Sequence, residues 1–387
     1  MSRSNFKFIL TGALASVWLA AATPAASLTI NLIDIGGVTG SSAQTGFQIA
    51  ARYWESVLIN DATVNLNVGY SNLGPNVLGG TRSSLAQFVP ISDYYSLLAG
   101  SGTTALDAQA LANLSPLNSA GGVSVIVPGN LSPGSGIDPF STRMAPDDAI
   151  NSTIALSTAN LRALGIDLGG FVDGQIEFSS TFGFDFNPTN GIGTGQYDFI
   201  GVAVHEIGHA LGFISGVDDF DFAAGFPGVV DDVWWGYGLD MFRYSASGQL
   251  DWSVGTGSYF SIDGGQTPLY DSYFSTGSDF GNGWQASHWR PPGQPTPCDH
   301  FRGIMNPYIC DGRGAAVTGL DLALFDAIGW NLNFDVLADN NRYRVTSADM
   351  YTSFRAAVPE PATWAMLILG FGLIGVCVRA RQPRPAT

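Results

Sequence analysis

Three observations predict that this chain of 387 residues folds as an α+β protein. Some segments place apolar residues at the spacing of an amphipathic helix, and others alternate apolar and polar residues with the two-residue period of a half-buried strand. Hydrophobic residues make up 45% of the chain and charged residues 12%, which supplies enough apolar material for a large core. No repeat with a period of about 20 to 50 residues indicates a solenoid or a propeller.

The first half of the chain contains both patterns. Residues 46–58 place Phe47, Trp54 and Leu58 at helical spacing, and residues 63–70 alternate as a half-buried strand does. The other elements predicted in this half are helices at 84–100 and 147–164 and strands at 123–127 and 175–179.

The second half begins with a strongly apolar helix. Residues 197–213 have the helical pattern, with Asp198 predicted to cap the first turn and Gly212 to end the last. Residues 215–286 are rich in Gly, Asp and aromatic residues, so hairpins and loops are predicted there. A final helix is predicted at 318–328, capped by Thr318 with Asp321 three residues on.

The charge balance excludes one class of partner. The net charge is -16, and Lys7 is the only lysine, so the chain offers no basic stripe. Because binding to phosphates needs such a stripe, nucleic acid is not an expected partner.

The N-terminus has the layout of a secretory signal peptide. Arg3 and Lys7 precede an apolar run at 8–22, and small residues follow at 25–27. We therefore predict a signal peptide at residues 1–26, removed by signal peptidase, rather than a permanent anchor, because the run is too short to span a bilayer comfortably.

The C-terminus carries a second targeting pattern. Val-Pro-Glu-Pro at 358–361 precedes an apolar stretch at 362–378 and a cluster of three Arg residues, which the positive-inside rule leaves in the cytoplasm. The segment 358–387 resembles the PEP-CTERM sorting signal of Gram-negative bacteria. That resemblance implies transient anchoring by a transmembrane helix, recognition by an exosortase and delivery to the cell surface or extracellular matrix; a plain tail anchor is the alternative.

Two of the three Cys residues lie in the exported part of the chain. Cys377 falls in the apolar C-terminal stretch, whereas Cys298 and Cys310 are close together in a segment where oxidation is permitted. We predict a disulfide between Cys298 and Cys310.

The motif that carries chemistry is H-E-x-x-H within the helix predicted at 197–213. Spacing of four places His205 and His209 one turn apart on the same face, where both can bind one metal ion. Neutral imidazoles suit Zn²⁺, and a catalytic zinc site takes three protein ligands and leaves a fourth position for water. Glu206 is the predicted general base that takes a proton from this water as it attacks a carbonyl.

The third ligand does not follow from the motif alone. The compact pattern H-E-x-x-H-x-x-G-x-x-H would place it at position 215, but Ser215 is a poor zinc ligand. The candidates left are the imidazoles of His288 and His300 and the carboxylates of Asp218, Asp219 and Asp240.

The pattern resembles the leishmanolysin-like and matrixin-like metzincin metalloproteases, in which a long insertion separates the zinc helix from the third His and a Met-turn. The resemblance covers roughly residues 197–307 and rests on His205-Glu206-x-x-His209-Ala210-Leu211-Gly212-Phe213, Ser287-His288-Trp289 and Met305-Asn306-Pro307. It implies His288 as third ligand, Met305 in the Met-turn, and a twisted sheet plus active-site helix (27–212) over a loop- and hairpin-rich C-terminal subdomain (213–357).

The function expected from this resemblance is zinc-dependent hydrolysis of peptide bonds in protein or peptide substrates. An extended substrate would add to an edge strand above the zinc helix, which we expect to include Ile176, Glu177 and Phe178. Pro307 occupies the position where astacin-like enzymes place an oxyanion-binding Tyr, and Tyr308 is one residue further on.

Two further roles remain as alternatives. Loop aspartates could bind Ca²⁺, although their spacing fits no EF-hand: Asp218, Asp219, Asp221, Asp231 and Asp232. The aromatic residues Trp234, Trp235, Trp252 and Trp284 could instead mark a catalytically weak surface protein that binds glycans on the same scaffold.

Overall fold

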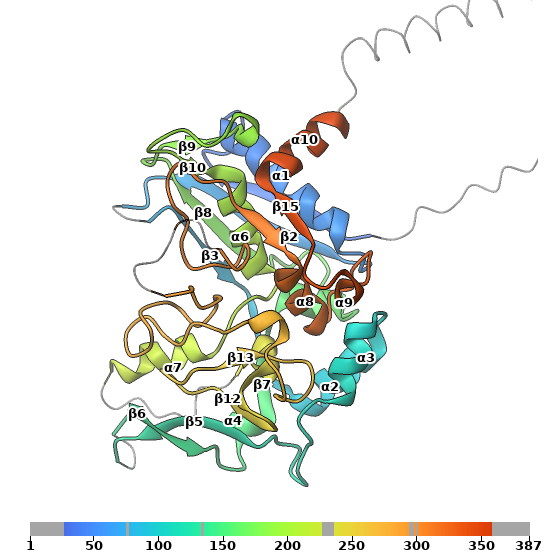
Figure 1. Cartoon of the computed structure of the whole chain (residues 1–387), viewed down its shortest axis with the longest axis vertical. Coiled ribbons are helices and arrows are strands. Elements are labelled where there is room, and N and C mark those ends of the chain that lie inside the picture. The colour runs from blue at the N-terminus through green and yellow to red at the C-terminus, as the bar shows by residue number, and fades with distance from the viewer. Residues whose placement is uncertain are drawn as a thin grey trace, which may run out of the picture.

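The computed structural model describes residues 27–74, 77–132, 135–226, 236–293, 298 and 301–357. The predicted signal peptide and the predicted sorting signal lie outside these residues. In the described part, helices and strands are mixed and form several sheets, which confirms the α+β prediction. Figure 1 shows one sheet with α1 (Ser42–Val57) and α6 (Phe199–Ala210) in the upper half and another sheet with α7 (Val217–Ala224) in the lower half.

The upper sheet has four strands in the order β1-β2-β8-β3. β1 (Thr29–Gly36), β2 (Thr63–Ser71) and β8 (Gly174–Ser179) are parallel, and β3 (Gly79–Ser83) pairs with β8 in the antiparallel direction. Ile176, Glu177 and Phe178, which were expected on an edge strand, belong to β8. Because β8 lies between β2 and β3, that expectation is wrong. The edge strand next to the helix of the H-E-x-x-H motif is β3.

Two long helices pack together against this sheet. α1 (Ser42–Val57) lies along α6 (Phe199–Ala210), and the indole Nε1 of Trp54 donates to the carbonyl of Val204 at 3.1 Å. A Cβ at Gly46 would lie 2.2 Å from the ring of Phe199, so the close approach of the two helices requires glycine there. The helices predicted around 46–58 and 197–213 and the strand at 63–70 are therefore confirmed.

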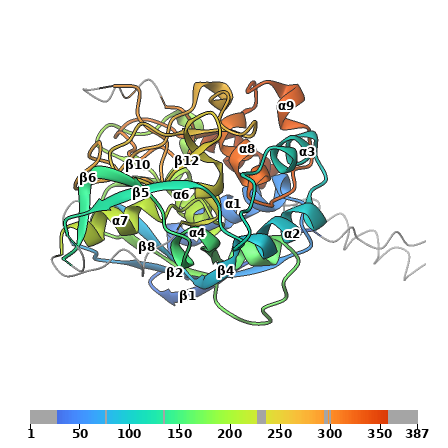
Figure 2. The same ribbon diagram turned by 90° about the horizontal axis from the view of Figure 1, so that it is seen from below.

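The second sheet has five strands in the order β13-β11-β12-β5-β6. Its members are β5 (Val125–Asn130), β6 (Ile137–Met144), β11 (Arg243–Ala246), β12 (Gln249–Asp251) and β13 (Tyr259–Phe260). β12 pairs in parallel with β5, so strands from both sides of Gly212 share one sheet. The two predicted parts of the chain, 27–212 and 213–357, are therefore interleaved in space, as the view from below also shows (Figure 2).

Two predicted helices are wrong because each contains a strand. The segment 84–100 divides into β4 (Leu85–Pro90) and α2 (Ile91–Ser101), and Pro90 stands at the N-cap of the helix. The segment 147–164 divides into α4 (Ala149–Ser152), β7 (Thr153–Ser157) and α5 (Thr158–Ala163). β4 and β7 pair with each other in the antiparallel direction, so a contact between distant segments overrides the local helical pattern.

The remaining elements complete the fold. α7 falls within the stretch where hairpins and loops alone were predicted, and the Thr318–Asp321 capping box of α8 is confirmed. These elements are α3 (Ala105–Ala112), α7 (Val217–Ala224), α8 (Gly319–Ala327), α9 (Val336–Asp339), α10 (Ser347–Ala357), β9 (Phe184–Asp185), β10 (Tyr197–Asp198), β14 (Ala316–Thr318), β15 (Arg344–Thr346), and short 3-10 helices at Pro188–Asn190, Gly238–Phe242 and Leu269–Asp271.

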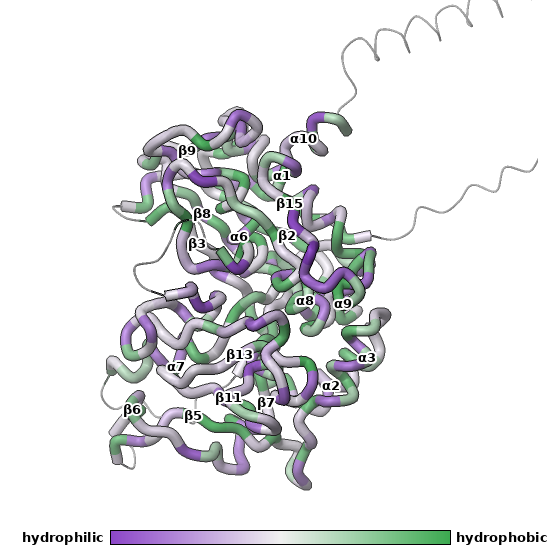
Figure 3. Tube along the Cα trace, viewed as in Figure 1, coloured by the Kyte–Doolittle hydropathy of each residue, from purple (hydrophilic) through white to green (hydrophobic). Residues whose placement is uncertain are grey.

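One apolar cluster runs through both halves of the molecule. It joins residues of α1, β2 and β8 to residues of β11, α8 and α2, and apolar stretches appear in both halves of Figure 3. Among the described residues, no helix is long and apolar enough to cross a bilayer. The predicted span at 362–378 lies outside them.

Candidate metal centre

Helix α6 carries the first two histidines of the site. The side chain of Asp198 caps its N-terminus by accepting the backbone N–H of Gly201 at 3.0 Å. The helix is almost entirely buried, and the chain leaves it at Gly212, which has a positive φ of 118°. His205 and His209 therefore project from a fixed, buried scaffold.

The structure brings three imidazoles together at one point. The Nε2 atoms of His205 and His209 are 3.0 Å apart, and the Nε2 atom of His288 lies 3.3 Å from the first and 3.2 Å from the second. In the described part of the chain, these three side chains form a cluster that could hold a metal ion. His300 lies outside the described residues.

Backbone carbonyls set the tautomer of each ring. The Nδ1 atoms lie 2.7 Å from the carbonyl of Ile304 for His205, 2.7 Å from that of Phe213 for His209 and 3.3 Å from that of Gln285 for His288. Since a carbonyl only accepts, each Nδ1 must donate its proton. The three Nε2 lone pairs then face one another with no proton between them, an arrangement that a cation stabilises.

Burial favours the neutral form of two of these imidazoles, His209 and His288. Desolvation lowers the pKa of His209 to about 3, with a smaller contribution from His205. It also lowers the pKa of His288 well below its usual value. Neutral imidazole is the form that binds a metal, so the protein holds these two side chains in the ligand state over the physiological range.

Glu206 lies beside the first histidine and faces the edge strand. Its carboxylate accepts a hydrogen bond from the hydroxyl of Thr81 in β3 at 2.8 Å. Burial raises the pKa of Glu206, whereas His205 and the Thr81 hydroxyl act in the opposite direction. A carboxyl group with a raised pKa next to a possible metal site is suited to accept and release a proton.

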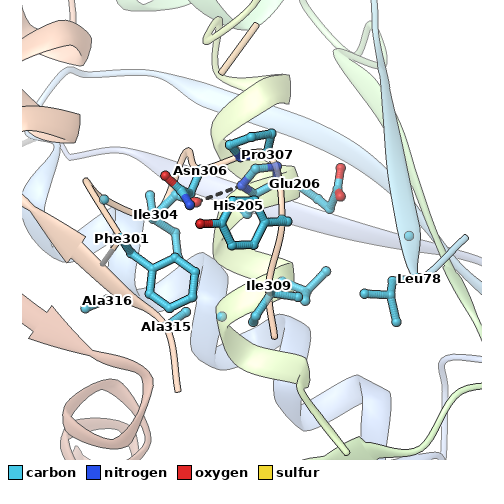
Figure 4. A pocket seen from close by; sticks show the side chains of 15 residues that line it. Leu78, His205, Glu206, Phe301, Ile304, Asn306, Pro307, Ile309, Ala315 and Ala316 are labelled. Atoms are coloured by element: carbon cyan, nitrogen blue, oxygen red, sulfur yellow. Dashed lines mark hydrogen bonds between the residues drawn. The ribbon is translucent and has the colours of Figure 1, made fainter. Parts of the chain in front are cut away.

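A mainly apolar pocket of about 160 Å³ opens next to His205 and Glu206. Figure 4 shows Leu78 on one side of His205 and Ile304 and Phe301 on the other, with Pro307 above the His205 ring. Tyr308 also lines this pocket, and its ring packs 5.5 Å from that of Trp284. The pocket is therefore a place for an apolar side chain next to the histidine cluster.

A polar network beneath the insertion positions His288. The carboxylate of Asp218 accepts the backbone N–H groups of Ala286 and Ser287 at 2.5 and 3.0 Å and the hydroxyl of Ser287 at 2.5 Å. The Ser287 hydroxyl in turn accepts the N–H of Ser215 at 2.9 Å. Sequence reasoning considered Asp218 as a ligand and missed this role, because its partners lie almost 70 positions away.

The other carboxylate candidates for third ligand are engaged elsewhere. The side chain of Asp240 is fully buried and accepts the Ser215 hydroxyl at 2.6 Å and the Gly216 and Tyr237 amides at 2.8 and 2.9 Å. Asp219 accepts the Tyr237 hydroxyl at 2.5 Å. Neither lies in the histidine cluster, so the geometry supports neither of them as a ligand.

Other aspartates and tryptophans from the sequence analysis have structural partners. Asp221 accepts the backbone amides of Asp279 and Phe280, each at 2.8 Å. Trp252 is fully buried and donates to the carbonyl of Asp240. Asp231, Asp232, Trp234 and Trp235 lie outside the described residues. Asp221 and Trp252 thus contribute to the fold.

Met305 lies directly under α6 and is fully buried. A Cβ at Gly208 would lie 2.7 Å from its sulfur, so a glycine in the helix makes room for this methionine. The backbone carbonyl of Met305 accepts the N–H of Trp289 at 3.0 Å. This bond ties the turn to the residue after His288.

Asp321 holds the turn that contains Ile304 and Met305. The sequence predicted only that Asp321 would help to cap a helix. Its buried carboxylate accepts five hydrogen bonds, from the indole of Trp289, the amides of Ile304, Met305 and Thr318, and the Thr318 hydroxyl. The turn that supplies the carbonyl for His205 is therefore anchored on α8.

Replacing Asp321 with asparagine should lower the free energy of unfolding by about 3 kcal/mol, because an amide NH₂ would face donors at a buried site. Chemical denaturation measures the change. Asp335→Asn is the control, since Asp335 caps the short helix α9 from an exposed position and asparagine caps equally well. A loss below about 1 kcal/mol in Asp321→Asn would contradict this role for the carboxylate.

The predicted disulfide is confirmed. Cys298 and Cys310 are bonded, with their Cα atoms 5.9 Å apart. The bond closes the loop that contains Ile304, Met305 and the wall of the pocket. It therefore limits the movement of the segment that faces His205.

Comparison with known proteins identifies the C-terminus. Residues 357–382 match the PEP-CTERM protein-sorting motif. No curated protein and no solved structure matches the chain. The chain carries a bacterial sorting signal.

This motif establishes the route of the protein rather than its chemistry. PEP-CTERM proteins are processed by exosortase and exported to the envelope or surface of Gram-negative bacteria, as the sequence analysis expected. The histidine cluster, Glu206 and the pocket thus belong to a protein that works outside the cytoplasm, where the Cys298–Cys310 disulfide is stable.

Proposed function

We propose that this protein is an exported zinc-dependent endopeptidase of the metzincin type, with His205, His209 and His288 as ligands and Glu206 as general base. The observation that carries the proposal is the convergence of three Nε2 atoms within 3.0–3.3 Å, each on a ring whose Nδ1 faces a backbone carbonyl.

The donor set fits zinc. Tetrahedral coordination with Zn–N distances of about 2.0–2.1 Å requires the nitrogens to be about 3.3–3.4 Å apart, and the three observed Nε2–Nε2 distances are 3.0, 3.2 and 3.3 Å. Three imidazole ligands whose Nδ1 atoms donate to backbone carbonyls, together with one open position, are typical of catalytic rather than structural zinc sites. Zinc in such a site supplies a Lewis acid that polarises a peptide carbonyl and acidifies water.

Glu206 supplies the proton transfers in this proposal. Its carboxylate takes a proton from the attacking water and delivers it to the nitrogen of the departing amine. The raised pKa that burial produces favours uptake of the proton in the first of these steps. The hydroxyl of Thr81, in the middle of β3, donates to this carboxylate at 2.8 Å.

The substrate would be an extended peptide. β3 is an edge strand with β8 on one side, so an extended chain can pair with its other side through main-chain hydrogen bonds. Gly79 of this strand lines the pocket together with His205 and Glu206. A peptide lying along β3 could therefore place an apolar side chain in the pocket next to the bond that is cut.

Metal content and hydrolysis, measured on the same preparation, test the proposal. The exported protein should contain about one zinc per chain and cut casein, and removal of zinc by 1,10-phenanthroline should abolish cutting until zinc is restored. Magnesium added to the metal-free protein is the control, since a hard oxygen-seeking cation does not suit three imidazoles. If the protein bound one zinc per chain but hydrolysed no member of a peptide library, the alternative would be favoured: a surface protein with the same fold and no peptidase activity.

A further inference from the structure

The face of β3 that meets α6 is unusual for a strand that packs on an apolar helix. Gly79, Thr81 and Ser83 lie on this face, since every second residue of a strand points the same way. The Ser83 hydroxyl donates to the carbonyl of His209 at 3.0 Å, and the Thr81 hydroxyl lies 2.8 Å from both the carbonyl and the carboxylate of Glu206. Hydroxyls thus occupy positions where packing alone would favour valine or isoleucine.

The two hydroxyls have different partners. Ser83 reaches only the backbone of the helix, at the C-terminal turn, where the carbonyl of His209 also accepts the N–H of Gly212 at 3.1 Å. Thr81 also reaches a side chain, because its hydroxyl lies within hydrogen-bond distance of the Glu206 carboxylate as well as of the Glu206 carbonyl. The Glu206 side chain has several rotatable bonds, so this hydrogen bond selects one of its orientations.

We propose that Thr81 is a positioning residue for the general base. Its hydroxyl holds the Glu206 carboxylate in the orientation that proton transfer requires, and it links that carboxylate to the strand on which the substrate would lie. This inference rests on the proposed function and assigns a second role to β3, which would orient the base as well as the peptide. Register supports the link, because Thr81 pairs with the fully buried Ile176 and cannot slide along the sheet.

The matched pair Thr81→Val and Thr81→Ser tests the role of the hydroxyl. Valine has nearly the shape of threonine and lacks the hydroxyl, whereas serine keeps it. With a fluorogenic peptide, we expect Thr81→Val to lower kcat about tenfold, as the loss of one charge-assisted hydrogen bond implies, with KM and zinc content unchanged. Thr81→Ser should keep kcat within about twofold of wild type.

A neighbouring variant and a readout independent of activity separate this role from a structural one. Ser83→Ala removes the neighbouring hydroxyl without touching the carboxylate, so Glu206 in its metal-free form should keep the single rotamer of wild type. Crystal structures of the metal-free proteins should show one Glu206 rotamer in wild type and more than one in Thr81→Val, independent of any activity.

The outcomes distinguish the failure of this inference from failure of the proposed function. Active wild-type enzyme with equal kcat in Thr81→Val, or with equal losses in the valine and serine variants, would overturn the positioning role alone. Loss of zinc in parallel with kcat would also overturn it. An inactive wild type would remove the proposed function, and a single Glu206 rotamer in Thr81→Val would then overturn the positioning role as well.

Discussion

Glu206→Gln should abolish peptide hydrolysis and leave the zinc content at the wild-type level. Glutamine has the shape of glutamate, and its Oε1 can still accept the Thr81 hydroxyl, so the side chain should keep its place. An amide cannot take a proton from water, and kcat should fall by at least about 10²-fold. Hydrolysis of a fluorogenic peptide and zinc analysis of the same sample measure both quantities.

Glu177→Gln is the matched control for this substitution. Glu177 lies on β8 between the fully buried Ile176 and Phe178, so it points to the opposite face of the sheet from the core side. Its activity should equal that of wild type. If Glu206→Gln retained more than a tenth of the wild-type kcat, Glu206 would not be the general base, whatever metal the site holds.

Local sequence patterns predict the site residues that lie within one turn of α6 and the residue that caps this helix. His205, Glu206 and His209 follow from a five-residue spacing, and Asp198 follows from its place before an apolar run. The position of α6 and its N-cap could therefore be predicted from the sequence, and so could the disulfide, whose two Cys residues are 12 positions apart.

The parts that could not be predicted depend on pairing between distant segments. β8 has the alternation of a half-buried strand, but nothing in its own residues says that β3 would cover its other side. β4 and β7 fall within patterns that are locally helical, and they become strands because they pair with each other across about 70 residues. Thr81 carried no signal in the sequence, since one threonine in a five-residue segment is unremarkable until β3 is placed on α6.

The third proposed ligand, His288, could be predicted only in part. The residues alone left two histidines and three aspartates open, and the resemblance to metzincins chose His288. The structure adds an independent reason, because the Asp218–Ser287–Ser215 network orients the segment that delivers this imidazole to the other two. Hydrogen bonds from backbone amides to buried side chains, and not apolar contacts alone, therefore connect the segment that carries His288 to the chain that follows α6.

His288→Ala should remove the metal and, with it, hydrolysis. Two ligands one helical turn apart hold zinc much more weakly than three, so the dissociation constant should rise more than about 100-fold, and the protein as purified should contain little zinc. The rise in Tm that zinc produces in wild type should also disappear, since ligand binding to the folded state alone causes it. Titration with a zinc-buffered chelator and thermal unfolding measure the two effects.

His300→Ala completes this test, because His300 is the other imidazole that the sequence left open. It should keep wild-type zinc affinity, Tm shift and kcat if His288 is the ligand. The opposite result, zinc retained in His288→Ala and lost in His300→Ala, would mean that the three converging imidazoles are not the metal site. Since the Nε2 of His288 already lies 3.2 Å from that of His209 with its Nδ1 facing a carbonyl, the first outcome requires no rearrangement of the chain, whereas the second would require the insertion to move.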